Sequence, residues 1–164
     1  MIQEIDIKTW IITLTSLITM ITTAKGQDIL PKISLAQLDD SMLVKPQPIV
    51  VLIGSGRCGY CAMQRKLLEK DKQIALLFKS VYFVELNAEE DSPVYFNKRL
   101  YQPPLKGVSG GIHDLAVTLS GNQNQMSFPL WILLDANYRV LYRYNGLLRK
   151  NQLMSLLSLD VPEN

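Results

Sequence analysis

The hydrophobic pattern of the chain predicts strands and helices in alternation. Short, continuous apolar runs that are rich in β-branched residues indicate buried strands, and apolar positions three and four apart indicate helices. The expected strands are 48–53, 81–86, 129–134 and 138–144, and the expected helices are 34–44, 58–78, 92–101, 112–119 and 149–159. Strands joined through helices run parallel, whereas a hairpin is antiparallel. The order therefore predicts an α/β fold with a mixed four-stranded central sheet flanked by helices on both faces.

The N-terminal segment, residues 1–24, stands apart from this pattern. Residues 9–24 carry no charge, but six of them are threonine, and the run is shorter than the ~20 apolar residues that span a bilayer as a helix. We interpret residues 1–24 as a secretory signal that is cleaved after Ala24, although Glu4 and Asp6 are unusual there. A retained membrane anchor and a buried core helix are the alternatives. Export would place the domain at 25–164 in the periplasm or otherwise outside the cytoplasm, where a dithiol meets an oxidising environment.

The composition excludes several classes of protein. A chain of 164 residues with 48% hydrophobic and 20% charged residues is long enough for one compact domain. A net charge of +2 gives no indication of nucleic-acid binding. Two cysteines are too few for a disulfide-stapled scaffold, and one histidine makes a Ser-His-Asp triad or a histidine-based metal site a poor candidate.

The two cysteines lie in the sequence Cys58-Gly59-Tyr60-Cys61, where an expected strand passes into an expected helix. A thiol at a helix N-terminus is more acidic, because the free N–H groups and the helix dipole stabilise the thiolate. Arg57, directly before Cys58, adds a positive charge. The first cysteine of such a pair attacks a substrate disulfide, and the second resolves the mixed disulfide.

Other uses of a Cys-X-X-Cys motif fit this sequence less well. A zinc site needs four ligands, and His113 does not complete the set, so zinc would require a dimer. Covalent haem attachment requires histidine where Ala62 stands. Residues 54–59 match G-x-G-x-x-G, but the chain is too short for a doubled nucleotide-binding sheet. An inert, structural cysteine pair remains a further alternative. We therefore expect no metal and no bound cofactor.

Three segments resemble the thioredoxin superfamily, and the resemblance covers roughly residues 33–160. These segments are PIVVLIGSGRCGYCAMQRKLLE, VYFVELNAEE and FPLWILLDANYRVLYRYNGLLRKNQLMSLL. The resemblance implies a thioredoxin-like fold in which Phe128-Pro129 supplies the cis-proline beside the cysteines. It further implies that Cys58 is the nucleophile and Cys61 the resolving thiol. Substrate contacts would come from Arg57, Gly59, Tyr60, Phe128 and Pro129.

The sequence also departs from the family pattern. Arg57 replaces the usual tryptophan, Leu52 replaces the buried acid, and Glu85 replaces the basic residue that would face that acid. We hypothesise that Glu85 moves the proton of Cys61 during resolution. The alternative is a solvated glutamate at the end of a strand.

Residues 97–127 form an apparent insertion before the cis-proline strand, and such segments often set partner specificity. His113, within it, is expected at the exposed start of a helix, with an approach to the cysteines as the alternative. The resemblance implies an extracytoplasmic thiol–disulfide oxidoreductase that acts on protein thiols and disulfides and exchanges electrons with a membrane redox partner. A reductant is favoured over an oxidant. The alternative is a thioredoxin-like binding module without significant redox turnover.

Overall fold

The computed structural model describes residues 30–105, 111–121 and 126–158. The helices are α2 (Leu35–Val44), α3 (Gly59–Lys70), α4 (Lys72–Leu77), the 3-10 helix η2 (Phe78–Ser80), α5 (Asp114–Ser120) and α6 (Lys150–Leu157). The strands are β1 (Ile49–Gly54), β2 (Tyr82–Asn87), β3 (Val94–Phe96), β4 (Arg99–Tyr101), β5 (Leu130–Leu134) and β6 (Val140–Asn145). The expected leader at 1–24 lies outside the described residues, as do parts of the expected insertion at 97–127. No helix within the described ranges is long and apolar enough to cross a membrane.

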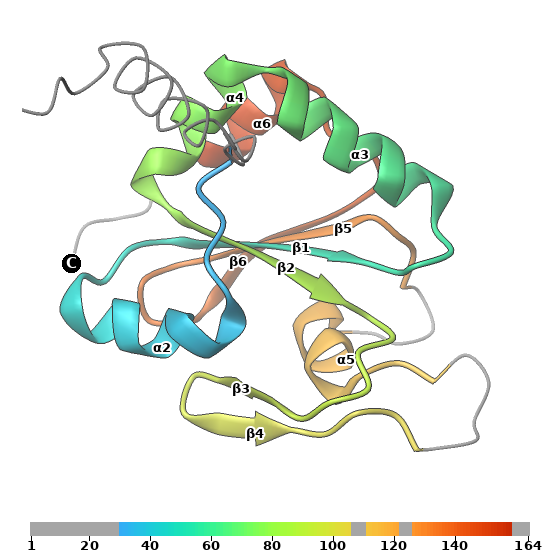
Figure 1. The fold of residues 1–164 in the computed structure, drawn as a ribbon. Helices are drawn as coiled ribbons and strands as arrows, with labels where there is room; N and C mark the ends of the chain where they lie inside the picture. Colours follow the sequence, from blue (N-terminus) through green and yellow to red (C-terminus); the bar gives the residue numbers. More distant parts are fainter. Residues whose placement is uncertain (1–29, 106–110, 122–125, 159–164) are drawn as a thin grey trace, which may run out of the picture.

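The central sheet has four strands in the order β2-β1-β5-β6 (Figure 1). β1 pairs parallel with β2 and antiparallel with β5, and β5 pairs antiparallel with β6. This is the mixed sheet that the sequence predicts. All residues of β1 and β5 are buried, because these two strands are covered on both faces.

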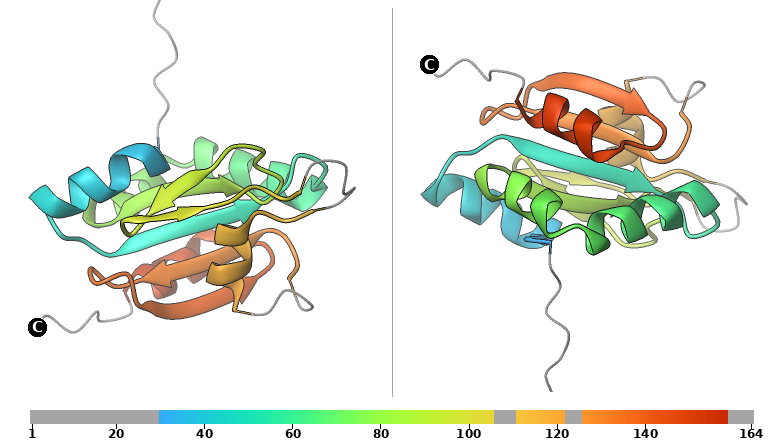
Figure 2. Two further views of the ribbon diagram at one scale, coloured as in Figure 1. Left: turned by 90° about the horizontal axis from the view of Figure 1, so that it is seen from below. Right: turned by 90° about the horizontal axis from the view of Figure 1, so that it is seen from above.

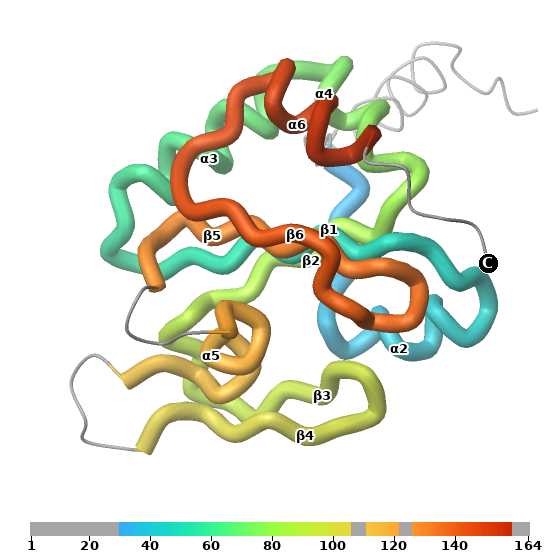
Figure 3. Tube along the Cα trace, turned by 180° about the vertical axis from the view of Figure 1, so that it is seen from behind, coloured from blue at the N-terminus to red at the C-terminus, as the bar shows by residue number. Residues whose placement is uncertain are grey.

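Helices cover both faces of the sheet, and successive side chains of β1 point into opposite layers. α3, α4 and α6 lie on one face, and α2, α5 and the β3–β4 hairpin lie on the other (Figures 1 and 2). Val50 and Leu52 join the core under the first group, whereas Ile49, Val51 and Ile53 join the core under the second. Each such fully buried side chain contributes ~1.5–3 kcal/mol relative to an exposed one. Viewed from behind, the chain turns back after β6, and α6 lies beside α4 on the side of the sheet that α3 also covers (Figure 3).

The helix predicted over 58–78 is interrupted at Asp71. α3 ends at Lys70, and the Asp71 carboxylate accepts a hydrogen bond from the Gln73 N–H at the start of α4. An aspartate in this role satisfies a backbone donor at a helix N-terminus and favours a new start over continuation.

The helix predicted over 92–101 is wrong, because this segment forms the β3–β4 hairpin. Asn97 and Lys98 occupy its turn with φ angles of 51° and 59°, the left-handed conformation that tight two-residue hairpins require. Asp39 of α2 accepts hydrogen bonds from both of their N–H groups, at 2.9 and 2.7 Å. A distant carboxylate thus holds a turn that has no glycine.

Asp39 also accepts a hydrogen bond of 2.6 Å from the Tyr138 hydroxyl, in the turn between β5 and β6. Burial alone would raise the pKa of the Asp39 carboxyl, but the hydrogen bonds from Tyr138, Lys98 and Asn97 outweigh it and lower that pKa below 3.8. The pKa of Tyr138 is raised by its burial and by the neighbouring carboxylate. The ionised Asp39 carboxylate therefore connects α2 to the turn of the β3–β4 hairpin and to the turn between β5 and β6.

The Asp39→Asn variant should lose about 2 kcal/mol of unfolding free energy at neutral pH, because hydrogen bonds to a charged acceptor are lost. Since the folded-state pKa of Asp39 is lowered, this stabilisation is present above pH 3.8 and disappears as the pH falls through the folded-state value. Denaturant titration of wild type and variant at neutral pH and well below pH 3.8 measures both effects. Asp40→Asn, on an exposed neighbour, is the control. A destabilisation that does not change with pH would contradict the assignment.

Candidate active site

The two cysteines lie at the junction between β1 and α3. Cys58 is the N-cap residue of α3, and its Sγ accepts a hydrogen bond of 3.0 Å from the Cys61 N–H. The two sulfurs form a disulfide. A short turn thus follows the buried strand β1. The first turn of α3, which comes next, brings the two sulfurs together.

The two sulfurs differ in their exposure to solvent. Cys58 is half-buried, whereas Cys61 is only 1% exposed. An incoming thiolate or disulfide can therefore reach Cys58 more readily than Cys61. Attack on the Cys58 sulfur would make Cys61 the leaving group.

Gly54, the last residue of β1, permits the close approach of Cys61 to the sheet. A methyl group at Gly54 would lie 3.1 Å from the Cys61 Sγ and 3.3 Å from its Cβ. These contacts are tighter than nearly all Cβ contacts in proteins, so a side chain there would displace the sulfur. The absence of a side chain, and not backbone flexibility, is what this position requires.

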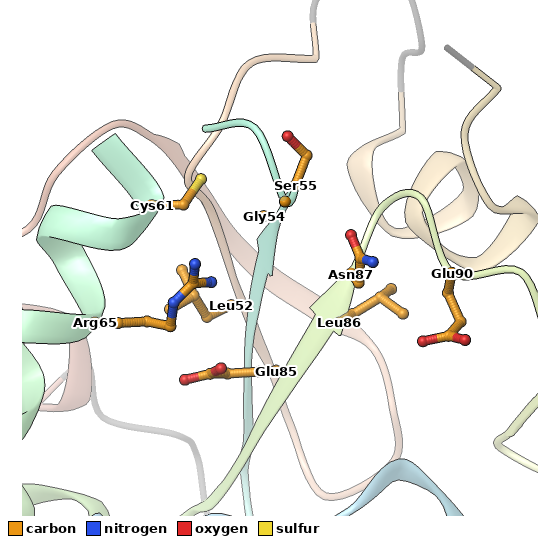
Figure 4. A pocket seen from close by; sticks show the side chains of 10 residues that line it. Leu52, Gly54, Ser55, Cys61, Arg65, Glu85, Leu86, Asn87 and Glu90 are labelled. Atoms are coloured by element: carbon orange, nitrogen blue, oxygen red, sulfur yellow. The ribbon is translucent and has the colours of Figure 1, made fainter. Parts of the chain in front are cut away.

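A cavity of about 390 Å³ lies beside the buried sulfur (Figure 4). Side chains from α3, β1 and β2 line it, and they include both charges and apolar groups. Its lining residues are Leu52, Gly54, Ser55, Gly56, Cys61, Arg65, Glu85, Leu86, Asn87 and Glu90. Cys61 therefore faces a partly open cavity that contains charged side chains, and Cys58 is not among the residues that line it.

Glu85 lies within this cavity and opposite Leu52 in the β1–β2 register, the juxtaposition that the sequence predicts. Its side chain is 27% exposed, which places it between the buried and solvated alternatives. Glu85 Oε1 lies 3.2 Å from the Lys32 Nζ, at ion-pair distance but without hydrogen-bond geometry. Glu85 and Cys61 thus line the same cavity.

The remaining predicted site residues of the cysteine loop are exposed. Arg57 has a side chain that is 77% exposed, and its Nη2 lies 3.1 Å from the Glu89 Oε1. This ion pair offsets the positive charge that the sequence places beside Cys58. Gly59 is exposed, and Tyr60 is 64% exposed, so both can contact a docking partner.

The Phe128–Pro129 peptide bond is cis. Ile53 pairs with Leu130 across β1 and β5, which places Pro129 at the same end of the sheet as Gly54 and the cysteine loop. The Pro129 carbonyl accepts a hydrogen bond of 2.8 Å from the Gly146 N–H. The structure thus brings a cis-proline turn to the edge at which Cys58 lies.

His113 is fully buried, which corrects the expectation of an exposed helix start. Its Nδ1 accepts from the Leu115 N–H and caps α5, so its Nε2 carries the proton that faces the Ser92 carbonyl at 3.2 Å. His113 is not among the residues that line the cavity at Cys61. Its contacts give it a structural role.

Two residues near the cysteines were missed by sequence reasoning. Gln64, fully buried, accepts a hydrogen bond from the Leu148 N–H and donates one to the Leu148 carbonyl, which ties α3 to the start of α6. Arg65 extends into the cavity, in the space between Cys61 and Glu85 (Figure 4). The spacing of four from Cys61 to Arg65, which puts both on one helix face, is the signal that could have found Arg65.

Within the described ranges, no group of three or more histidine, cysteine or acidic side chains is placed to hold a metal ion.

Comparison with known proteins adds only distant likenesses. No protein-family model and no curated protein sequence matches the chain. Among 151 solved chains that match, one is a yeast mitochondrial 1-Cys peroxiredoxin, with 14% identity over 77% of this chain and 90% of that chain and a TM-score of 0.45. A chloroplastic thioredoxin z shows 21% identity over 78% of this chain and 90% of that chain, with a TM-score of 0.48. Likenesses this weak do not bear on function.

The strand order, the mixed pairing and the flanking helices define a thioredoxin-like fold. On this fold, a Cys-X-X-Cys disulfide caps the helix that follows the central strand β1. The class of protein is thus a thioredoxin-like domain with a Cys-X-X-Cys pair at its β1–α3 junction.

The Gly54→Ala variant should push the Cys61 sulfur away from β1, because the added methyl group would approach it to 3.1 Å. We expect a loss of about 1–3 kcal/mol in the unfolding free energy of the oxidised protein, the usual cost of overpacking. Gly59→Ala is the matched control, since a methyl group there has no neighbour within 4 Å. Equal stability of the two variants in denaturant titration would show that the contact does not constrain the site.

Proposed function

We propose that the protein is an extracytoplasmic thiol–disulfide oxidoreductase that reduces disulfides in protein substrates. The observation that carries this proposal is the pairing of a half-buried Cys58 at the N-terminus of α3 with a fully buried Cys61. Unequal exposure lets a substrate reach one sulfur while the other is kept for resolution, as thiol–disulfide exchange requires. Phe128 and Pro129, on the same edge of the sheet as the cysteine loop, are proposed to form the docking site for an extended substrate segment.

The reaction needs only the two sulfurs and a proton carrier. In the reduced protein, the Cys58 thiolate attacks a substrate disulfide, forms a mixed disulfide and releases one substrate thiolate. Cys61 then loses its proton and attacks the Cys58 sulfur, which frees the second substrate thiolate and closes the Cys58–Cys61 disulfide. Two electrons pass to the substrate. A dithiol partner returns two electrons to the protein by the reverse exchange.

Glu85 is proposed as the group that takes the Cys61 proton. It shares the cavity with Cys61, whereas the exposed Arg57 and Tyr60 are proposed to contact the substrate on the opposite side of the disulfide. The uncharged leader at 9–24 motivates the extracytoplasmic location, and a membrane redox partner is proposed as the electron donor there.

The first test is the reduction of a protein disulfide, such as that of insulin, with a small dithiol as electron donor. Cys58→Ser should abolish turnover, because the attacking sulfur is lost. Cys61→Ser should accumulate a mixed disulfide through Cys58, because nothing resolves it. Gel electrophoresis without reductant detects the trapped species. Insulin reduction by Cys58→Ser at the wild-type rate would indicate a binding module whose cysteines take no part.

Glu85→Gln should slow the resolving step by about 10²-fold, at the low end of the range for general acid–base catalysis, and should flatten its dependence on pH. Rapid-mixing kinetics of mixed-disulfide decay across the neutral pH range gives this profile. Glu90→Gln is the matched control, since Glu90 lines the same cavity and accepts a hydrogen bond from Ser92. An unchanged profile in Glu85→Gln would remove Glu85 from the mechanism.

A further inference from the structure

Arg65 brings a positive charge to the buried side of the disulfide. It follows Cys61 by one helical turn on α3, and its half-buried side chain lines the same cavity. A methyl group at Gly54 would contact both the Cys61 Sγ at 3.1 Å and the Arg65 Nη1 at 3.9 Å. The sulfur and the guanidinium nitrogen therefore both lie within 4 Å of one point beside Gly54, and a charge this near a sulfur can act on it through the cavity.

Among the described residues, no carboxylate of the cavity lies within ion-pair distance of Arg65. Among the described residues, no salt bridge or hydrogen bond to the Arg65 guanidinium is present. Glu85 lies at ion-pair distance from Lys32, and Glu90 accepts a hydrogen bond from the Ser92 hydroxyl. A guanidinium remains protonated in proteins, so a half-buried one without a partner anion is unfavourable.

Reduction of the disulfide creates the missing anion. We propose that Arg65 stabilises the Cys61 thiolate, which forms whenever a dithiol donor reduces the protein. This inference rests on the proposed function and names the half-reaction that Arg65 serves. Arg65 acts on the leaving sulfur through its charge and is a positioning residue.

The step can be written with its electrons balanced. A donor thiolate attacks the Cys58 Sγ, a new S–S bond forms between donor and Cys58, and the Cys58–Cys61 bond breaks. The electron pair of that bond passes to Cys61, which leaves as a thiolate facing Arg65. A better-stabilised thiolate is a better leaving group. Arg65 therefore favours reduction of the Cys58–Cys61 disulfide by the electron donor. The same stabilisation makes Cys61 a weaker nucleophile in the resolving step.

The test compares Arg65→Met, Arg65→Lys and Lys66→Met in equilibrium with reduced and oxidised glutathione. The measurements are made at pH 9, above the ordinary thiol pKa of ~8.5. At this pH the stability of the thiolate contributes to the equilibrium constant for reduction. Arg65→Met should lower the equilibrium constant for reduction about tenfold, equivalent to ~30 mV for two electrons. Arg65→Lys should keep most of the wild-type value. Lys66→Met, which removes the same charge from an exposed neighbour, should leave it unchanged.

A second readout is the rate at which dithiothreitol reduces the disulfide, which should fall in Arg65→Met and be restored in Arg65→Lys. Should Arg65→Met fail to fold, Arg65→Gln replaces it. Equal constants in Arg65→Met and Lys66→Met would overturn the proposal, as would Arg65→Lys behaving like Arg65→Met. Neither readout needs a protein substrate. A failure of substrate reduction with the Arg65 effect intact would therefore count against the proposed function alone.

Discussion

The site depends on the contact between the backbone of Gly54 and the sulfur of Cys61. β1 is the only strand of the central sheet with a parallel partner on one side and an antiparallel partner on the other, so its position is fixed from both directions. Its last residue carries no side chain, and the Cys61 sulfur occupies the space that a side chain would fill. The first turn of α3 can therefore lie close to the sheet, which buries one cysteine and leaves the other within reach of solvent.

Because Cys61 is buried and Cys58 is not, the disulfide has an outer side at Cys58 and an inner side at Cys61. On the outer side, Cys58 is accompanied by an exposed loop and by an arginine whose charge is balanced by Glu89. On the inner side, Cys61 faces a cavity that is lined by the Arg65 guanidinium and by the carboxylates of Glu85 and Glu90. Partner recognition and control of the buried thiolate can then depend on different residues. Leu52 brings no charge to this cavity, and its charges come from Arg65 on α3, Glu85 on β2 and Glu90 after β2.

The central sheet could be predicted because its signal is local. Runs such as 48–53 are continuously apolar, and they form strands that are buried on both faces. The β3–β4 hairpin could not be predicted in the same way, since the turn at Asn97 and Lys98 has no glycine and is held by Asp39 from another element. The burial of His113 likewise depends on a carbonyl 21 residues away. The break at Asp71 did have a local signal, an aspartate able to cap a helix.

At the site, the cysteines, Glu85 and Pro129 could be located from spacing and resemblance. Arg65 could not, because its importance lies in what the fold leaves around it. A long cation on a helix is ordinarily solvated, and only the cavity beside Cys61 distinguishes Arg65 from Lys66. The sequence shows that Arg57 precedes Cys58, but the ion pair between Arg57 and Glu89 could not be predicted from it.

The central claim is that the Cys58–Cys61 disulfide is reactive rather than structural, and its reduction potential in the wild-type protein tests this most directly. Dedicated thiol–disulfide exchange proteins lie between about −270 and −120 mV, whereas structural disulfides of secreted proteins typically lie below about −300 mV. Equilibration with glutathione and with dithiothreitol buffers covers both ranges. We expect a reversible potential within the first range, toward its reducing end for a reductant. A value well below about −300 mV would contradict it.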